Sequence, residues 1–481
     1  MAWGRARLWG WRCARLCLLA TTIPYAAHAQ DADGLHWTPS LYWKSGDHRL
    51  DVGLVDRFRV EGWDAFTNET DFYTANRARL HLTYTWRDLL SLVGEVQDLR
   101  LNGLSPDLTG PGAIYRANSG GDDEAGGTGV RQLFLELRPV EGGFARVGRQ
   151  DVKLGAEAAY SEPDWHYLKT LRLGERLVGT VGWTQAERAY DGVSAGLERG
   201  GHVLYAFAAR PTTGLFDVDS AYRDMRQVEV GGLSWTVKRD TWLPNAELEA
   251  FAVGYRDDRA TDHGGLAKGV LIYTVGGSFL GIGPLGPGKV DLLLWGAGQW
   301  GRYSTLHQGA EAGMAELGYQ LPQLPARPWL RAGVNAASGD SDPTDRRHGT
   351  FFNLLPTNHP YYGFADQLAF QNLVDSFLQL RLTPHEKLAL NLFVHRFVLA
   401  SKADARYSGS GAFNESVFGF NAQPSRGRRN VGTEYDAVAT LTPDPHLTLE
   451  VGYSFLAGGG VLQVNRDPDV HFGYASIEVR Y

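Results

Sequence analysis

The chain has 481 residues, of which 43% are hydrophobic and 12% aromatic, and its formal net charge is -7 at pH 7. After the first thirty residues there is no run of about 18 or more apolar residues, which argues against transmembrane helices. The acidic balance argues against a broad basic surface for nucleic acid.

Residues 1–29 have the features of a cleaved secretory signal peptide. A short apolar stretch and an Ala27-His28-Ala29 cleavage signal follow four arginines: Arg5, Arg7, Arg12 and Arg15. A short N-terminal membrane anchor is the alternative. Both cysteines, Cys13 and Cys17, lie in this segment, so the exported chain would have no disulfide framework. Loss of the four arginines would lower the formal charge from -7 to -11.

After a periplasmic N-terminal segment expected at 30–48, the dominant pattern is strict period-two alternation. Within 49–62, Leu54, Phe58 and Val60 alternate with arginines and acids. Strands of soluble sheets average about five or six residues, whereas transmembrane barrel strands need about nine to eleven. Because most runs are of the longer kind, we predict an all-β fold: a transmembrane antiparallel β-barrel over residues 49–481. About eighteen strands are expected, near 49–62, 72–86, 90–101, 131–138, 144–151, 191–198, 202–210, 225–236, 246–256, 268–280, 288–300, 311–321, 328–337, 375–383, 387–399, 432–442, 446–456 and 469–481.

Short and long connections alternate along the chain. The short ones include 86–88, 138–143, 382–387 and 441–446, and the long ones lie near 102–130, 152–190, 338–374 and 400–431. Bacterial outer-membrane barrels have this layout, with short periplasmic turns and long external loops. An even strand count places both ends of the barrel in the periplasm.

The alternating residues at the end of the sequence, Ile477, Val479 and Tyr481, predict a closing strand that pairs with the first. An open edge in lipid would leave backbone groups without hydrogen bonds. A terminal aromatic residue also resembles the signal read by the outer-membrane assembly machinery. The alternative is a soluble exported β-sandwich or propeller.

Charged residues on the polar face of the strands should project into a water-filled lumen. A charge facing lipid costs about 2–4 kcal/mol at the membrane midplane. Lumen arginines could attract an anionic solute, or they could pair with lumen carboxylates and brace the wall. The residues placed in the lumen are Arg57, Arg59, Arg77, Arg79, Arg138, Arg146, Arg381, Glu61, Glu95, Glu136, Glu434, Asp436 and Glu450.

Several short stretches together resemble the alginate export family of outer-membrane barrels: Thr74 to Leu80, Gly148-Arg149-Gln150, Arg176-Leu177-Val178-Gly179, Trp183, Arg188 and Tyr190-Asp191-Gly192. The resemblance implies an eighteen-stranded barrel with an arginine-rich lumen, and characterised members of the family pass an anionic polysaccharide outward. It adds Arg149, Arg176, Arg188 and Asp191 to the candidate selectivity residues. The negative charge of the exported chain fits export of a polyanion poorly.

The chain departs from the family pattern in an insert at 151–175, between Gly148-Arg149-Gln150 and Arg176-Leu177-Val178-Gly179. The insert carries Trp165, His166, Lys169 and Arg172. It could fold into the pore as a constriction or gate, or it could lie outside as a plain loop.

Other motifs are weaker. Asp340, Asp342 and Asp345 have a spacing reminiscent of a calcium loop, but the EF-hand glycine and closing glutamate are missing. We therefore expect a solvated loop there, and no metal or cofactor. Neither a G-x-S-x-G motif nor a zinc or phosphate-loop motif occurs, so no catalytic residue is predicted.

The sequence predicts an outer-membrane channel of a Gram-negative bacterium, not an enzyme, for passive diffusion of a hydrophilic, anionic solute. The alternatives are an uptake porin for small carboxylates, sugars or aromatic acids, a barrel protease or phospholipase, and a structural barrel plugged by its loops. Expected partners are membrane lipid, lipopolysaccharide, the assembly machinery and periplasmic export components, with no nucleic acid.

Overall fold

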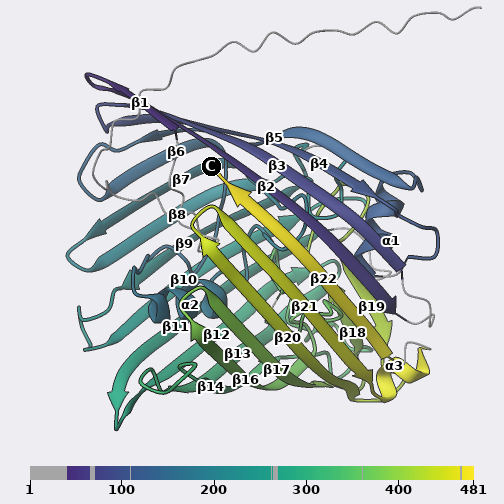
Figure 1. Ribbon diagram of the computed structural model, residues 1–481. Helices are drawn as coiled ribbons and strands as arrows, with labels where there is room; N and C mark the ends of the chain where they lie inside the picture. Colours follow the sequence, from purple (N-terminus) through teal and green to yellow (C-terminus); the bar gives the residue numbers. More distant parts are fainter. Residues whose placement is uncertain are drawn as a thin grey trace, which may run out of the picture.

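The computed structural model describes residues 41–65, 71–108, 110–220, 222–261, 263, 269–359, 361–465 and 469–481. These residues form a closed antiparallel β-barrel of eighteen strands (Figure 1). Two further strands of the same sheet, β1 (Leu41–Ser45) and β15 (Arg347–His348), are short additions to the wall. The predicted fold class is therefore confirmed, whereas the expected signal peptide at 1–29 lies outside the described residues.

The barrel strands follow one another around the wall in sequence order. They are β2 (His48–Ala65), β3 (Asp71–Trp86), β4 (Leu90–Asn102), β5 (Glu124–Leu137), β6 (Gly143–Gln150), β7 (Tyr190–Arg199), β8 (His202–Pro211), β9 (Val228–Val237), β10 (Ala246–Asp257), β11 (Val270–Leu285), β12 (Gly288–Tyr303), β13 (Leu306–Gln320), β14 (Trp329–Ala337), β16 (Leu373–His385), β17 (Leu388–Leu399), β20 (Asn430–Asp444), β21 (Leu447–Gly458) and β22 (Asp469–Arg480).

The period-two alternation places apolar side chains on the outside of the wall and polar side chains in the lumen. In β2, Leu54 and Phe58 are 49% and 42% exposed, whereas Arg57 and Arg59 are 8% and 2% exposed. Successive side chains of a strand point to opposite faces. The exposed face is therefore the apolar one, as a wall surrounded by hydrocarbon requires.

The first and last barrel strands close the wall. β2 pairs with β22 from Val55 opposite Arg480 to Ala65 opposite Val470. The backbone N–H groups of Leu54 and Tyr481 donate to each other's carbonyl oxygens over 2.7 and 2.8 Å. Beyond this point β1 takes over as the partner of β2, so part of the segment expected at 30–48 is a strand that prolongs the seam.

The two ends of the barrel differ in the length of their connections. At one end, the turn end, the connections include 87–89, 200–201 and 286–287. At the opposite loop end they include the longer segments 103–123, 151–189, 338–372 and 400–429. The hairpin 304–305 is a short exception at the loop end. Which end faces outward stays a prediction.

The long loops fold back into the barrel and build a core there. They contain α1 (Gly110–Asn118), α2 (Pro163–Leu168), the π-helix η1 (Lys169–Leu173) and the hairpin of β18 (Ala405–Gly409) and β19 (Phe420–Pro424), while α3 (Gly460–Val464) precedes β22. Val178 and Leu355 form a parallel bridge between two loops, and both are fully buried. None of the helices in the described ranges has the length and apolar character to span a membrane.

Candidate functional site

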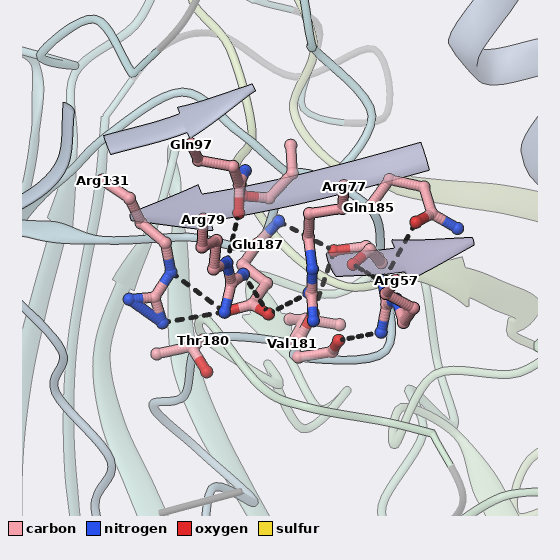
Figure 2. A network of polar contacts seen from close by, with 12 residues as sticks. Arg57, Arg77, Arg79, Gln97, Arg131, Thr180, Val181, Gln185 and Glu187 are labelled. Carbon is pink, nitrogen blue, oxygen red and sulfur yellow. Dashed lines mark hydrogen bonds and ion pairs between the residues drawn. The ribbon is translucent and has the colours of Figure 1, made fainter. Parts of the chain in front are cut away.

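Four arginines from β2, β3 and β5 gather on the lumen face of the wall (Figure 2). Arg57 on β2 is paired in register with Arg77 on β3, and Arg79 lies two residues further along β3. Arg131 on β5 completes the group. We call these four residues the arginine cluster, and each is at most 8% exposed.

The carboxylate of Glu187, in the loop 151–189, docks into the arginine cluster, and Asp151 at the start of the same loop also pairs with Arg131 over 2.9 Å. Oε1 of Glu187 lies 2.5 Å from a guanidinium nitrogen of Arg77 and 2.5 Å from one of Arg79. Its Oε2 accepts hydrogen bonds from Nη2 and Nε of Arg131 over 2.8 and 3.1 Å. Burial alone would raise the pKa of Glu187, but the charges of Arg79, Arg131 and Arg77 outweigh it and lower the pKa well below its usual value.

The backbone around Glu187 is held in an unusual conformation. Glu187 has a φ of 58°, a region that costs a residue with a side chain roughly 1–2 kcal/mol. Gly214 packs directly against it, since a Cβ at Gly214 would lie 1.9 Å from the Glu187 carbonyl oxygen. The ion pairs with the arginine cluster offset this strain.

Arg57 of the arginine cluster and the nearby Arg59 bind the same loop through neutral groups. Arg57 donates to the carbonyl of Thr184 over 3.1 Å and to the side-chain oxygen of Gln185 over 3.0 Å. The Arg59 guanidinium lies 4.1 Å from the centroid of Trp183, and the Trp183 ring also stacks in parallel on His359 at 3.9 Å. The loop thus covers the basic wall with two carboxylates, Asp151 and Glu187, several carbonyls and an aromatic ring.

Arg188 joins three loops into one body. Its guanidinium donates to the carbonyls of Gly179 and Leu355 over 3.3 and 3.1 Å, and to those of Ser410 and Ala412 over 2.9 Å each. These acceptors belong to segments 151–189, 338–372 and 400–429. Arg188 therefore lies in the lumen as a structural tie and does not present its charge to a solute.

The insert at 151–175 folds into the lumen. Trp165, Lys169 and Arg172 are buried there, and His166 is half-buried in α2. Nζ of Lys169 lies 2.6 Å from Glu247 on β10, and Arg172 binds Glu316 on β13 through two hydrogen bonds. Arg176, just after the insert, donates to Asn335 and Tyr362.

Two candidate residues do not face the lumen. Arg149 and Asp191 are register partners, and they pair with each other over 2.7 Å. Arg149 also lies opposite the outward-facing Leu133, and its strand neighbour on the same face is the exposed Val147. Both charges therefore lie on the outside of the wall near the loop end, because the register of β6 places them there.

The remaining candidates line other parts of the lumen. Arg146 pairs with Glu136 over 2.5 Å near the turn end. Glu434 and Asp436 are buried on β20, where the backbone N–H of Ala365 donates to Glu434 and the hydroxyl of Ser454 donates to Asp436. In the parts of the chain that the structure describes, Asp340, Asp342 and Asp345 form no group suited to a metal ion.

Sequence reasoning missed two residues of the site, Glu187 and Arg131. Arg131 has no partner residue in the ladder between β4 and β5, where the register shifts at Glu95, and the resulting bulge turns both Arg131 and Gln132 inward. Simple alternation cannot anticipate such a bulge. Glu187 could have been suspected because it precedes Arg188 in the stretch that carries the family resemblance.

Comparisons with known proteins agree with this architecture. The sequence profile described as "Alginate export" matches residues 48–475. The fold is similar to that of Pseudomonas aeruginosa OpdK with vanillate (TM-score 0.55, 11% identity, covering 90% of this chain and 99% of that chain). It is also similar to P. aeruginosa OccK9, or OpdG (0.58, 12%, 90% and 98%), and to Acinetobacter baumannii OccAB4 (0.57, 8%, 89% and 98%).

At these identities the likeness to solved structures concerns the fold alone, and no curated protein matches the sequence. The family profile, in contrast, covers most of the chain and all eighteen strands in whole or in part. This protein therefore belongs to the alginate export family and is a β-barrel of the bacterial outer membrane.

Proposed function

We propose that the protein is an outer-membrane channel through which a hydrophilic, anionic solute diffuses passively. The observation that carries the proposal is the docking of Glu187: a carboxylate is bound by three lumen arginines in this structure. Guanidinium groups bind carboxylates with good geometry and strength. When the loop moves aside, the same three arginines can bind carboxylates of a passing solute.

A second candidate is uptake of small carboxylates that carry a ring. Arg59 lies over the ring of Trp183, and Trp63, Phe472 and Tyr474 continue the aromatic surface beside it. Aromatic faces next to a guanidinium suit a flat acid as well as a uronic sugar. OpdK, which shares the fold, was solved with vanillate.

The enzyme alternative receives little support from the histidines in the lumen. Nδ1 of His359 lies 3.0 Å from Asp366, and Nδ1 of His395 lies 3.0 Å from Asp375. In both residues the other ring nitrogen, Nε2, has no hydrogen-bond partner among the described residues. Neither pair therefore activates a serine or cysteine in the way that nucleophilic catalysis requires.

Planar-bilayer recordings of the purified protein would test the channel. In a salt gradient we expect a reversal potential that shows preference for anions. Oligouronates and small aromatic carboxylates, added separately, should block the current to different extents and so identify the better ligand. A preference for cations, or equal insensitivity to both anions and to a neutral oligosaccharide, would contradict the proposal.

A further inference from the structure

The insert crosses the lumen and reaches the opposite mouth of the barrel. Glu162 pairs over 2.6 Å with Arg239, which lies in the connection 238–245 at the turn end. Asp164 pairs over 2.7 Å with Lys289, the second residue of β12 at the same end. Although the segment leaves β6 at the loop end, α2 therefore lies at the turn-end mouth (Figure 1).

Deeper contacts seat the insert on β10. Nζ of Lys169 lies 2.6 Å from Oε1 of Glu247 and 2.9 Å from Oε2 of Glu249. The hydroxyl of Tyr160 donates to Glu247 over 2.5 Å. Glu157 lies in the same group, and its Oε1 accepts a hydrogen bond from Ser234 on β9 over 2.9 Å.

This seat holds three carboxylates, those of Glu157, Glu247 and Glu249, against one ammonium group. Oε1 of Glu249 is buried and has no hydrogen-bond partner in the part of the chain that the structure describes. The neutral groups that face the seat are Tyr205 on β8, Ser234 on β9 and Ser278 on β11. Arg176 lines the same cavity as Glu249, but its guanidinium binds Asn335 and Glu316. Of the nearby guanidinium groups, Arg239 pairs with Glu162 and Arg172 with Glu316.

We propose that residues 151–173 are a gate at the turn-end mouth of the channel, and that its closed position requires a proton on Glu157, so that rising pH opens it. This proposal rests on the channel function proposed above. Within the closed seat, a proton shared among the three carboxylates leaves two negative charges. Lys169 neutralises one of them, and the hydrogen bonds stabilise the other. Without that proton, Glu157 and Glu249 repel each other across the gate and the wall.

The direction of the effect follows from linkage. Burial, together with the charge of Glu249, raises the pKa of Glu157 to about 8, while Lys169 opposes the rise. Since the seated acid holds its proton more tightly than an acid in water, closure is favoured at low pH and is lost as pH rises toward 8. Each pH unit in this range weakens closure by up to about tenfold. The pKa of Asp151, raised by burial to about 6, lies lower.

The first test measures open probability of the purified full-length channel between pH 7 and 9. We expect a rise of about tenfold in the wild type. Glu157→Gln should stay closed across the range, because the amide carries no charge, its oxygen can accept from the Gly155 N–H and its NH2 can donate to the Ser234 hydroxyl. Glu162→Gln, in the same segment but at the exposed rim, should keep the pH dependence of the wild type. If Glu157→Gln retains the wild-type rise, the role of Glu157 is wrong.

The second test fixes the gate covalently. With Cys13 and Cys17 replaced by serine, Asp164→Cys and Lys289→Cys introduce a defined pair of thiols. Bridging them with a bifunctional methanethiosulfonate should hold the channel closed at pH 9, and a thiol reductant should release it. Each single variant, treated identically, should open normally. A bridged channel that conducts like the released one would overturn the gate.

A third variant separates failure of the gate from failure of the channel. Replacing residues 156–173 with a short glycine-serine linker removes the gate, and heat-dependent migration on gels confirms that the barrel is folded. If this folded variant conducts anions without pH dependence, both proposals stand. If it conducts with the full pH dependence of the wild type, the channel stands and the gate is wrong. If it conducts nothing, the channel itself is wrong.

Discussion

At the scale of single residues, Glu187 pairs with three of the four arginines of the cluster. Its carboxylate neutralises part of the arginine cluster, and its lowered pKa keeps it ionised at neutral pH. Because its pKa is lowered, the docked loop keeps this stabilisation above the usual glutamate pKa and loses it only as pH falls through the lowered value. Its titration therefore does not interfere with that of Glu157.

Glu187→Gln should release the loop and expose the arginines. Removing one partner of a buried ion pair costs about 3–5 kcal/mol, so hydrogen exchange of residues 174–189 should accelerate strongly. The reversal potential should shift further toward anions. Glu450→Gln is the matched control, because Glu450 accepts hydrogen bonds from Tyr474 and Thr440 and has no arginine among these partners. Unchanged selectivity and exchange in Glu187→Gln would show that the loop is held by other contacts.

At the scale of elements, three loops share one anchor. Arg188 reaches carbonyls in each of them, and its side chain is fully buried. A guanidinium has five N–H donors in a rigid planar fork, whereas an ammonium has three on a flexible stem. Lysine therefore cannot make the same set of contacts, even though it keeps the charge.

Arg188→Lys should loosen the three loops together. Hydrogen bonds to a charged group contribute about 1.5–3 kcal/mol each, so loss of one or two should lower the local stability by roughly 3 kcal/mol. Hydrogen exchange should increase around Leu355 and around Ala412, far apart in sequence, while β2 and β3 stay protected. Faster exchange confined to 174–189 would mean that Arg188 does not couple the loops.

At the scale of the whole molecule, the outer surface of the wall is an apolar band. Leu378 lies in the middle of β16 and is 56% exposed, while Leu285 is the last residue of β11 at the turn end and is also 56% exposed. Equal exposure combined with different height makes these two leucines a direct probe of the membrane.

Leu378→Arg should destabilise the barrel in lipid by about 2–4 kcal/mol, because the charge would meet hydrocarbon at the midplane. Leu285→Arg should cost only about 0–1 kcal/mol near the interface. Denaturant titration of the folded barrel in vesicles measures both values. Equal losses of stability at the two positions would mean that the apolar band is not centred on the middle of the strands.

The barrel wall could be predicted from the sequence because alternation is a local property. The alternation within each strand indicates which of its side chains face lipid and which face water. The strand ends were predicted to within a few residues at most positions. The main deviation, a strand expected to begin at 131 that begins at Glu124, contains the bulge at Arg131. The position of a bulge depends on pairing with the neighbouring strand, so it cannot be predicted from the alternation within one strand.

The candidate site was predictable only in part. The lumen positions of Arg57, Arg59, Arg77 and Arg79 followed from alternation, whereas Arg149 and Asp191 were chosen for their place in a motif and lie outside. For the insert, a position inside the pore and a position outside it were both possible predictions. Its sequence alone does not indicate which residues of the barrel will pair with its charged side chains.

The sequence by itself determined the wall of this protein: period-two alternation, strand length and the closing strand suffice because lipid and water act on each strand separately. Only the tertiary structure decided what fills the lumen. The most distant partner of Lys169 lies about 80 residues away in the chain, and that of Arg188 lies more than 200 residues away. The separation for Glu187 falls between these values. Contacts of such range exist only after the barrel has closed, because closure brings those strands and loops to one place.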